Sequence, residues 1–149
     1  MKAKPMWILI ADGARARVLE TTGGASGLSE VPGLDLRADH RSSHEIRSDE
    51  PSRSYESVGA ARHAVEPRTD PHRELKRTFA HQLAAMLDER FARHEFDRLV
   101  LVAPPQMLGD LRNAISHSVR VKIAAELAMD LFKVPDSELG AHLKGLVRL

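Results

Sequence analysis

The chain has 149 residues, with 22 Lys and Arg against 21 Asp and Glu, and it contains no cysteine. A formal net charge of +1 excludes a chain-wide basic coat for nucleic acid, so a site for a polyanion must be a local patch. The lack of cysteine excludes disulfides, thiolate metal ligands and a cysteine nucleophile, and it fits a reducing compartment. We expect one domain over residues 1–149, because chains of this length usually form one.

The first predicted element is the continuous apolar run MWILIA at Met6–Ala11. An apolar run of this length indicates a strand that is covered on both faces. It is too short for the apolar core of a secretory signal, and no run is long enough to span a membrane, so we expect a cytoplasmic protein. The turn signal DGAR at Asp12–Arg15 and the run Ala16–Glu20 predict a β-hairpin, in which Gly13 is able to adopt a positive φ.

A weaker third strand is predicted at Leu28–Leu36, after a break at Thr21–Gly27. Pro32 and Gly33 interrupt this run, which indicates an edge strand or a bulged one. Residues 37–72 then carry many charges and few large apolar side chains. Such a composition cannot bury enough surface to offset its ordering entropy, so we expect a long mobile charged loop.

A long helix is predicted directly after this loop. Asp70 is a natural N-cap, Pro71 suits the first helical position, and Glu74 lies in the first turn, where the helix dipole favours an anion. Apolar residues recur at spacings of three and four from Leu75 to Phe91, which predicts one buried stripe.

The last third of the chain predicts two more strands and two more helices. The run RLVLVAPP at Arg98–Pro105 indicates a second fully buried strand, whose prolines open a helix. Apolar and basic residues alternate in Ser118–Leu127, which predicts a half-buried strand with a basic outer face. A short helix is expected to begin near Pro135 and Asp136. The whole order predicts an α/β domain with a mixed sheet of about five strands and helices on its faces.

Four sequence stretches together resemble the bacterial host attachment protein family, over nearly the whole chain. They are WILIADGARARVLE at 7–20, RHAVEPRTDP at 62–71, LVLVAPPQMLGDLR at 99–112 and AAELAMDL at 124–131. The order of elements also resembles the middle domain of archaeal and eukaryotic class 1 peptide-chain release factors and of Pelota-type ribosome rescue factors. This second resemblance implies a ribonuclease-H-like topology with a projecting loop before the long helix.

In those release factors the projecting loop ends in a Gly-Gly-Gln tip that enters the peptidyl-transferase centre of the ribosome. The corresponding loop of this chain contains Ser57, Gly59, Arg62 and His63, and it reads GAAR at Gly59–Arg62, without a glutamine. The resemblance therefore does not imply peptide release. It implies a cytosolic, non-catalytic domain that binds the ribosome, tRNA or another anionic partner, and we expect no cofactor and no metal.

Two interpretations of the charged loop remain open. Its arginines and acids can neutralise one another in a solvated segment. Alternatively, Arg53, Arg62, His63 and Arg68 form a polyanion-binding tip, because guanidinium groups bind phosphate bidentately.

Asp12 raises a competing hypothesis, because it ends the first strand where ribonuclease-H-like enzymes place a metal ligand. A metal-dependent hydrolase using Asp12 needs further carboxylates, and the candidates are Asp97, Glu126 and Asp130. The simpler interpretation is that Asp12 is the turn residue of the hairpin.

Other polar clusters are weaker candidates. His40 and His44 have metal-ligand spacing for a helix, but their segment has no helical periodicity, so we interpret them as surface histidines. A basic face would form if the first hairpin and the last strand were neighbours. Its members would be Arg15, Arg17, Arg112, Arg120 and Lys122.

Overall fold

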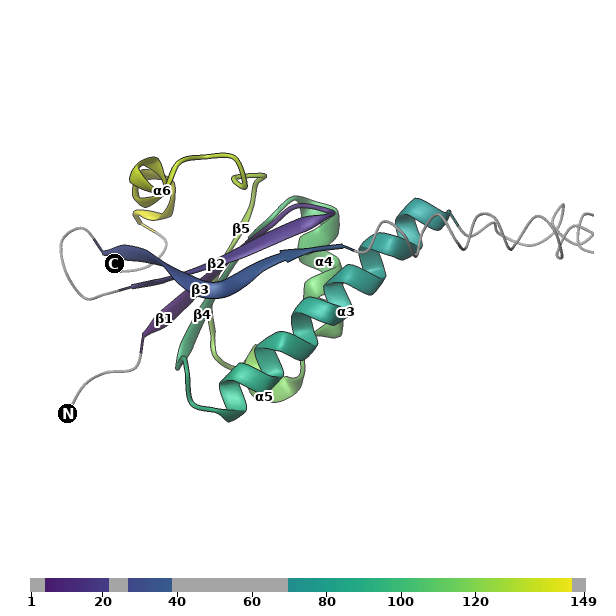
Figure 1. Cartoon of the computed structure of the whole chain (residues 1–149), viewed down its shortest axis with the longest axis horizontal. Coiled ribbons are helices and arrows are strands. Elements are labelled where there is room, and N and C mark those ends of the chain that lie inside the picture. Colours follow the sequence, from purple (N-terminus) through teal and green to yellow (C-terminus); the bar gives the residue numbers. More distant parts are fainter. Residues whose placement is uncertain (1–4, 22–26, 39–69, 146–149) are drawn as a thin grey trace, which may run out of the picture.

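The predicted α/β fold with a mixed five-stranded sheet is confirmed. Figure 1 shows the computed structural model, which describes residues 5–21, 27–38 and 70–145. The strand order is β3-β2-β1-β4-β5. β1 pairs antiparallel with β2 and parallel with β4, and the outer strands β3 and β5 pair antiparallel with β2 and parallel with β4, respectively. The strands are β1 (Met6–Ala11), β2 (Arg15–Thr21), β3 (Leu28–Arg37), β4 (Arg98–Ala103) and β5 (Ile123–Ala128).

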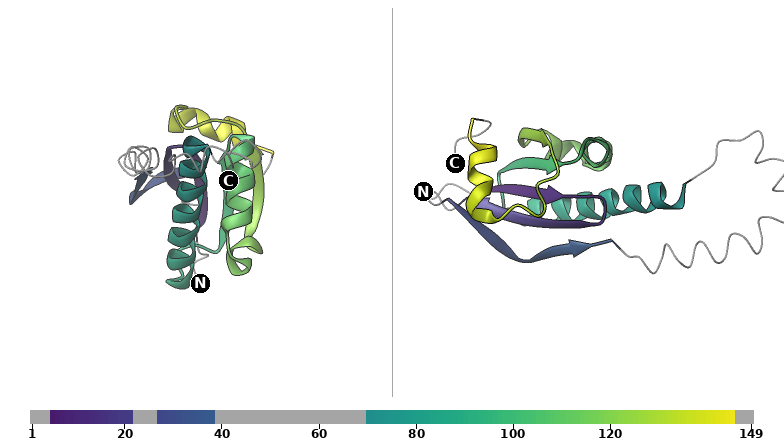
Figure 2. Two further views of the ribbon diagram at one scale, coloured as in Figure 1. Left: turned by 90° about the vertical axis from the view of Figure 1, so that its right-hand side faces the viewer. Right: turned by 90° about the horizontal axis from the view of Figure 1, so that it is seen from above.

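Helices cover both faces of the sheet (Figures 1 and 2). The described helices are α3 (Pro71–Ala92), α4 (Pro105–Ala114), α5 (His117–Arg120) and α6 (Asp136–Leu143). Side chains of α3, α4 and α5 pack in one hydrophobic cluster with one face of the sheet, and those of α6 pack in a second cluster with the other face. None of the described helices has the length and apolar character needed to cross a membrane.

β1 is the central strand, and its burial explains its continuous apolar sequence. All six of its residues are buried. Trp7 and Leu9 pack in the cluster that contains α3, whereas Ile8 and Ile10 pack in the cluster that contains α6. Side chains alternate between the two faces of a strand, so a strand covered on both faces needs an apolar residue at every position.

The hairpin between β1 and β2 is confirmed, but the role predicted for Gly13 is wrong. The described glycines with a positive φ are Gly27, Gly33 and Gly145, and Gly13 is not among them. A Cβ atom at Gly13 would lie 2.9 Å from Cε of Lys76, a residue of α3. The glycine therefore leaves room for the lysine side chain that crosses the turn.

β3 is an edge strand, as predicted. Its pairing with β2 shifts register between Arg17 and Leu19. Gly33, which follows Pro32 at this irregularity, has a φ of 81°, a conformation that glycine adopts without strain. The proline and the glycine thus mark a bulged edge strand, as such residues usually do.

The start of α3 follows the predicted capping pattern. The side chain of Asp70 accepts a hydrogen bond from the backbone N–H of His72 at 3.0 Å, and Pro71 opens the helix. Phe79, Leu83 and Leu87 form the buried stripe of this helix. Leu75, Met86 and Phe91 are half-buried against the same cluster.

The strand predicted over Ser118–Leu127 is wrong in its first half. His117–Arg120 form the short helix α5, because Ser116 caps it through a hydrogen bond from the N–H of Val119 at 3.3 Å. Val119 is buried, whereas Val121 is 61% exposed, so the apolar alternation does not lie on one strand face. β5 begins only at Ile123.

The bounds of the predicted mobile loop at residues 37–72 are also corrected. Arg37 belongs to β3, and Pro71 and His72 belong to α3. Ala38 is buried, and its N–H donates to the carbonyl of Ala14 at 2.7 Å. The rest of that segment, residues 39–69, lies outside the described residues.

Candidate functional site

Asp12 is held by its own hairpin turn. Its Oδ1 accepts the backbone N–H groups of Ala14 at 2.8 Å and Arg15 at 2.7 Å. Its Oδ2 accepts hydrogen bonds from the Arg15 guanidinium, from Nε at 3.2 Å and from Nη2 at 2.9 Å. Partial burial acts to raise the pKa of Asp12, but the hydrogen bonds from Ala14 and Arg15 outweigh it and hold the pKa below its usual value. The carboxylate therefore stabilises the turn.

Each of the carboxylates proposed to join Asp12 has a partner of its own. Glu126 is paired with Arg112 at 2.7 Å, and Asp97 is 3.8 Å from Nζ of Lys122. Asp130 accepts the N–H of Phe132 at 3.3 Å. Within residues 5–21, 27–38 and 70–145, no group of three or more His, Asp or Glu side chains could hold a metal ion. The described residues thus give the hydrolase hypothesis no metal site, and His40 and His44 lie outside them.

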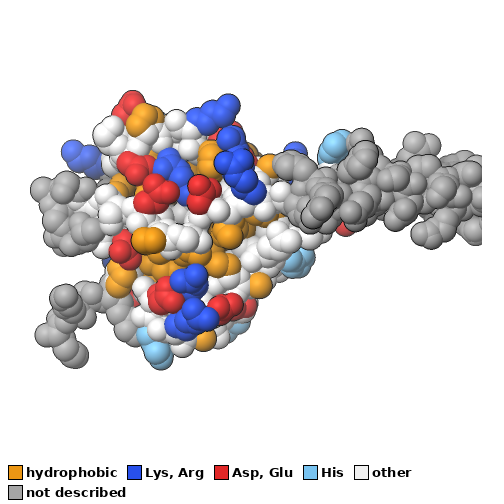
Figure 3. Space-filling view, viewed as in Figure 1, with side chains coloured by type: hydrophobic (Ala, Val, Ile, Leu, Met, Phe, Trp, Pro, Cys, Tyr) orange, Lys and Arg blue, Asp and Glu red, His pale blue; other side chains and the backbone are white. Residues whose placement is uncertain are grey.

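The predicted basic face does not form. β2 and β5 are separated in the sheet by β1 and β4, so the hairpin and the last strand are not neighbours. Arg17 instead bonds Asp136 of α6 and donates to the carbonyl oxygen of Val134 at 2.8 Å. Arg120 donates to backbone carbonyls of α4 and its C-cap. On the face seen in Figure 3, basic and acidic side chains are intermixed.

The residues proposed for the loop tip lie outside the described part of the chain. They are Arg53, Ser57, Gly59, Arg62, His63 and Arg68. Their connection to the described fold is known from the sequence, since Arg68 precedes the N-cap Asp70 by two residues. The start of α3 is thus the described part of the chain that lies next to Arg68 in the sequence.

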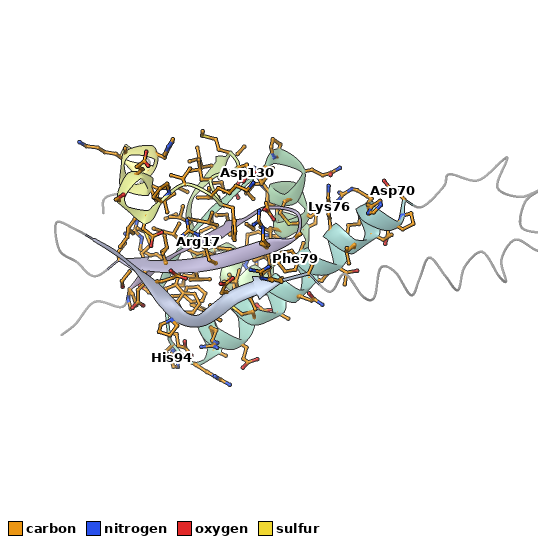
Figure 4. All side chains as sticks on the ribbon, turned by 45° about the horizontal axis from the view of Figure 1, so that its top comes forward. Arg17, Asp70, Lys76, Phe79, His94 and Asp130 are labelled. Atoms are coloured by element: carbon orange, nitrogen blue, oxygen red, sulfur yellow. The ribbon has the colours of Figure 1, made fainter. Side chains whose placement is uncertain are left out.

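The first three turns of α3 carry a group of basic side chains that we call the α3 basic surface. Its members are Arg73, Lys76, Arg77 and His81. Lys76 is exposed, lies against Gly13 of the hairpin turn and makes no ion pair with any described residue. Arg77 is half-exposed and pairs with Glu74 one turn earlier, at 2.6 Å. Figure 4 shows Lys76 and the capping Asp70 on the turns of α3 that extend beyond the sheet.

Arg73 anchors this surface to α4. Its Nη1 and Nη2 each donate to one carboxylate oxygen of Asp110, both at 2.6 Å. The Asp110 side chain is 10% exposed and that of Arg73 is 22% exposed. The hydrogen bonds from Arg73 lower the pKa of Asp110 below its usual value, although burial acts to raise it. The charges of Arg77 and His81 also lower this pKa. A bidentate pair of this kind is strong and fixes geometry.

A small cleft of about 100 Å³ lies beside this ion pair, where α3 and α4 pack together. Its lining consists of Arg77, His81, Asp110 and Asn113. None of these four residues was a candidate in the sequence. The run of basic residues after the N-cap was a signal for the α3 basic surface, but nothing local pairs Arg73 with a residue 37 positions away.

A family model described as "Protein required for attachment to host cells" matches residues 7–143. The match includes every described helix and nearly all of the sheet. No curated protein matches the chain.

Replacing Asp12 tests its role in the turn. We expect Asp12→Ala to lower the free energy of unfolding by about 0.5–2 kcal/mol, as for a lost capping side chain, because two backbone N–H groups lose their acceptor. Asp12→Asn should cost less, since its Oδ1 still accepts both. Urea denaturation measures these changes. A melting temperature that rises with Mg²⁺ in the wild type, but not in Asp12→Asn, would contradict the turn role and favour a metal site.

The Arg73–Asp110 pair should make stability depend on pH. Asp110→Asn should lower the free energy of unfolding at pH 7 by about 1.5–3 kcal/mol, the range for hydrogen bonds to charged groups. The pKa of Asp110 is lowered by folding, so its contribution is complete above the unfolded pKa of about 3.9 and disappears as the pH falls through the folded value. The difference between wild type and variant should therefore shrink between pH 5 and pH 2 in urea titrations. Glu89→Gln, at an exposed pair with Arg93, is the control and should change stability by less than about 1 kcal/mol.

Proposed function

The chain belongs to the host attachment family, and we propose that it binds ribosomal or transfer RNA through the α3 basic surface and the arginines that precede it in the sequence. The observation that supports this proposal is the gathering of Arg73, Lys76, Arg77 and His81 at the start of α3. In the sequence, Arg62 and Arg68 come shortly before the same helix.

The local charge around the start of α3 suits an anionic polymer. Between residues 62 and 77 there are five Arg and Lys residues against three Asp and Glu residues. The net charge of the whole chain is only +1, so an anionic polymer would have to bind a local group of basic side chains. Arginine binds phosphate oxygens bidentately and lysine adds a compact point charge, so both side chains suit a nucleic-acid backbone.

The position of this surface on a rigid element also supports the proposal. Arg73 ties the start of α3 to α4, and the buried stripe of α3 ties the helix to the sheet. Because the backbone beneath the basic side chains is already ordered, binding a phosphate backbone would cost conformational entropy only in the side chains.

The resemblance to release-factor middle domains suggests the class of partner. Those domains act on the ribosome, and it is the sequence of this chain that resembles theirs in its expected order of elements, although its Gly59–Arg62 segment lacks the Gly-Gly-Gln tip. We therefore propose a non-catalytic role on the translation apparatus in the cytoplasm. The description of the family records a requirement for attachment to host cells, and an RNA-binding protein would meet it indirectly, through the synthesis of other proteins.

Cosedimentation with ribosomes from the native cell tests this proposal. Binding by the wild-type protein should weaken steeply as salt increases, because bound phosphates release their counterions. The double variant Lys76→Ala/Arg77→Ala should bind more weakly and reduce the slope of log K against log salt by about 1 for each lost phosphate contact. Arg62→Ala/Arg68→Ala should have an effect of the same kind.

Arg93→Ala is the matched control, because Arg93 is an exposed, ion-paired arginine just past the other end of the same helix. It should leave cosedimentation unchanged. If the wild-type protein does not cosediment, or does so equally well at all salt concentrations, the proposed function is wrong.

A further inference from the structure

The cleft between α3 and α4 is lined by residues of both helices, whereas the α3 basic surface belongs to α3 alone. All four of its residues are polar: Arg77 and His81 come from α3, and Asp110 and Asn113 come from α4. The two α3 residues are four apart and the two α4 residues are three apart, so each pair lies on one face of its helix. The cleft thus lies between the polar faces of the two helices.

Asp110 lines one side of this cleft, and Arg73 neutralises the charge of its carboxylate. Nine-tenths of its side chain is buried, and each of its oxygens accepts a hydrogen bond from Arg73 at 2.6 Å. The carboxylate charge is therefore balanced within the wall, and an anion that enters the cleft meets an ion pair of no net charge. The remaining lining consists of the Arg77 guanidinium, the His81 imidazole and the Asn113 amide.

These three groups supply hydrogen-bond donors. A guanidinium has five N–H donors and an amide has two, and an imidazole donates from one nitrogen when neutral and from both when protonated. Arg77 uses Nη1 for Glu74, which leaves its other donors for a ligand. One carboxylate and one imidazole fall short of the ligand set of a protein metal site, so the lining favours an oxyanion over a cation.

The volume of the cleft limits the size of the ligand. About 100 Å³ corresponds to roughly three water molecules and lies well below the 300–1,000 Å³ of sites for drug-sized ligands. A single tetrahedral group fits this space, whereas an entire nucleotide would have to remain mostly outside it.

We propose that this cleft binds one phosphate group, with Arg77, His81 and Asn113 donating hydrogen bonds to its oxygens. The inference rests on the lining of the cleft, and it deepens the proposed function if the phosphate belongs to RNA. The same chemistry would accept inorganic phosphate, a phosphomonoester or a phosphodiester.

Titration of the protein with inorganic phosphate at constant ionic strength tests the site directly. In nuclear magnetic resonance spectra, the side-chain amide of Asn113 and the ring of His81 should shift with one saturable dissociation constant, and equal amounts of chloride should not shift them. Asn113→Asp, which places a negative charge in the cleft, should weaken phosphate binding at least tenfold. Arg77→Ala should act in the same direction, and Arg93→Ala should not.

Asn113 is exposed on α4, so its variants should fold, and an unchanged melting temperature confirms this for each one. If Asn113→Asp does not fold, Asn113→Ala takes its place and should also weaken binding. Phosphate that shifts neither Asn113 nor His81, or binds equally well to the Arg77 and Asn113 variants, would overturn the proposal.

A short RNA with and without a 5′-phosphate distinguishes the sources of the group. If the cleft takes a phosphomonoester, removal of the 5′-phosphate should abolish the shifts of Asn113 and His81, and if it takes a phosphodiester, the shifts should remain. Ribosome cosedimentation is measured in parallel on the same variants. If the protein binds phosphate but does not cosediment with ribosomes, the cleft proposal stands and the proposed function is wrong. If it cosediments but does not bind phosphate, the proposed function stands and the cleft proposal is wrong.

Discussion

The double hydrogen bond between Arg73 and Asp110 is the interaction on which the candidate site depends. It joins the first turn of α3 to α4, at the end of α3 that extends beyond the sheet. Because the Asp110 carboxylate is nine-tenths buried, loss of Arg73 would leave a buried charge without a partner, which is costly. The pair therefore holds the first turn of α3 against α4, beside Lys76, Arg77 and the cleft.

The sheet supplies the rigid base for this arrangement. β1 is buried on both faces, so helices on both sides pack against one central strand. On the side opposite α3, Arg17 fastens α6 to β2 through Asp136 and backbone carbonyls, which uses a basic side chain for structure and not for binding. At the start of α3, by contrast, Lys76 and Arg77 are exposed and therefore accessible to a partner.

Local patterns in the sequence predicted most of the fold but little of the site. The apolar run of β1, the Asp70–Pro71 cap and the Pro32–Gly33 bulge each follow from nearest-neighbour chemistry. The error at Ser118–Leu127 arose because Val119 reaches the core from a short helix, which an alternating pattern does not reveal. The basic face failed because strand order is a tertiary property, and Arg73–Asp110 was missed for the same reason.

The central claim is that an RNA backbone binds at the start of α3. Mapping of backbone amide shifts in ¹⁵N-labelled protein, titrated with a short single-stranded RNA, tests it most directly. The account predicts that, among the described residues, the largest shifts fall in residues 70–81 of α3 and 109–113 of α4. Shifts confined to α6 or β5, or no shifts at RNA concentrations far above those of the protein, would contradict it.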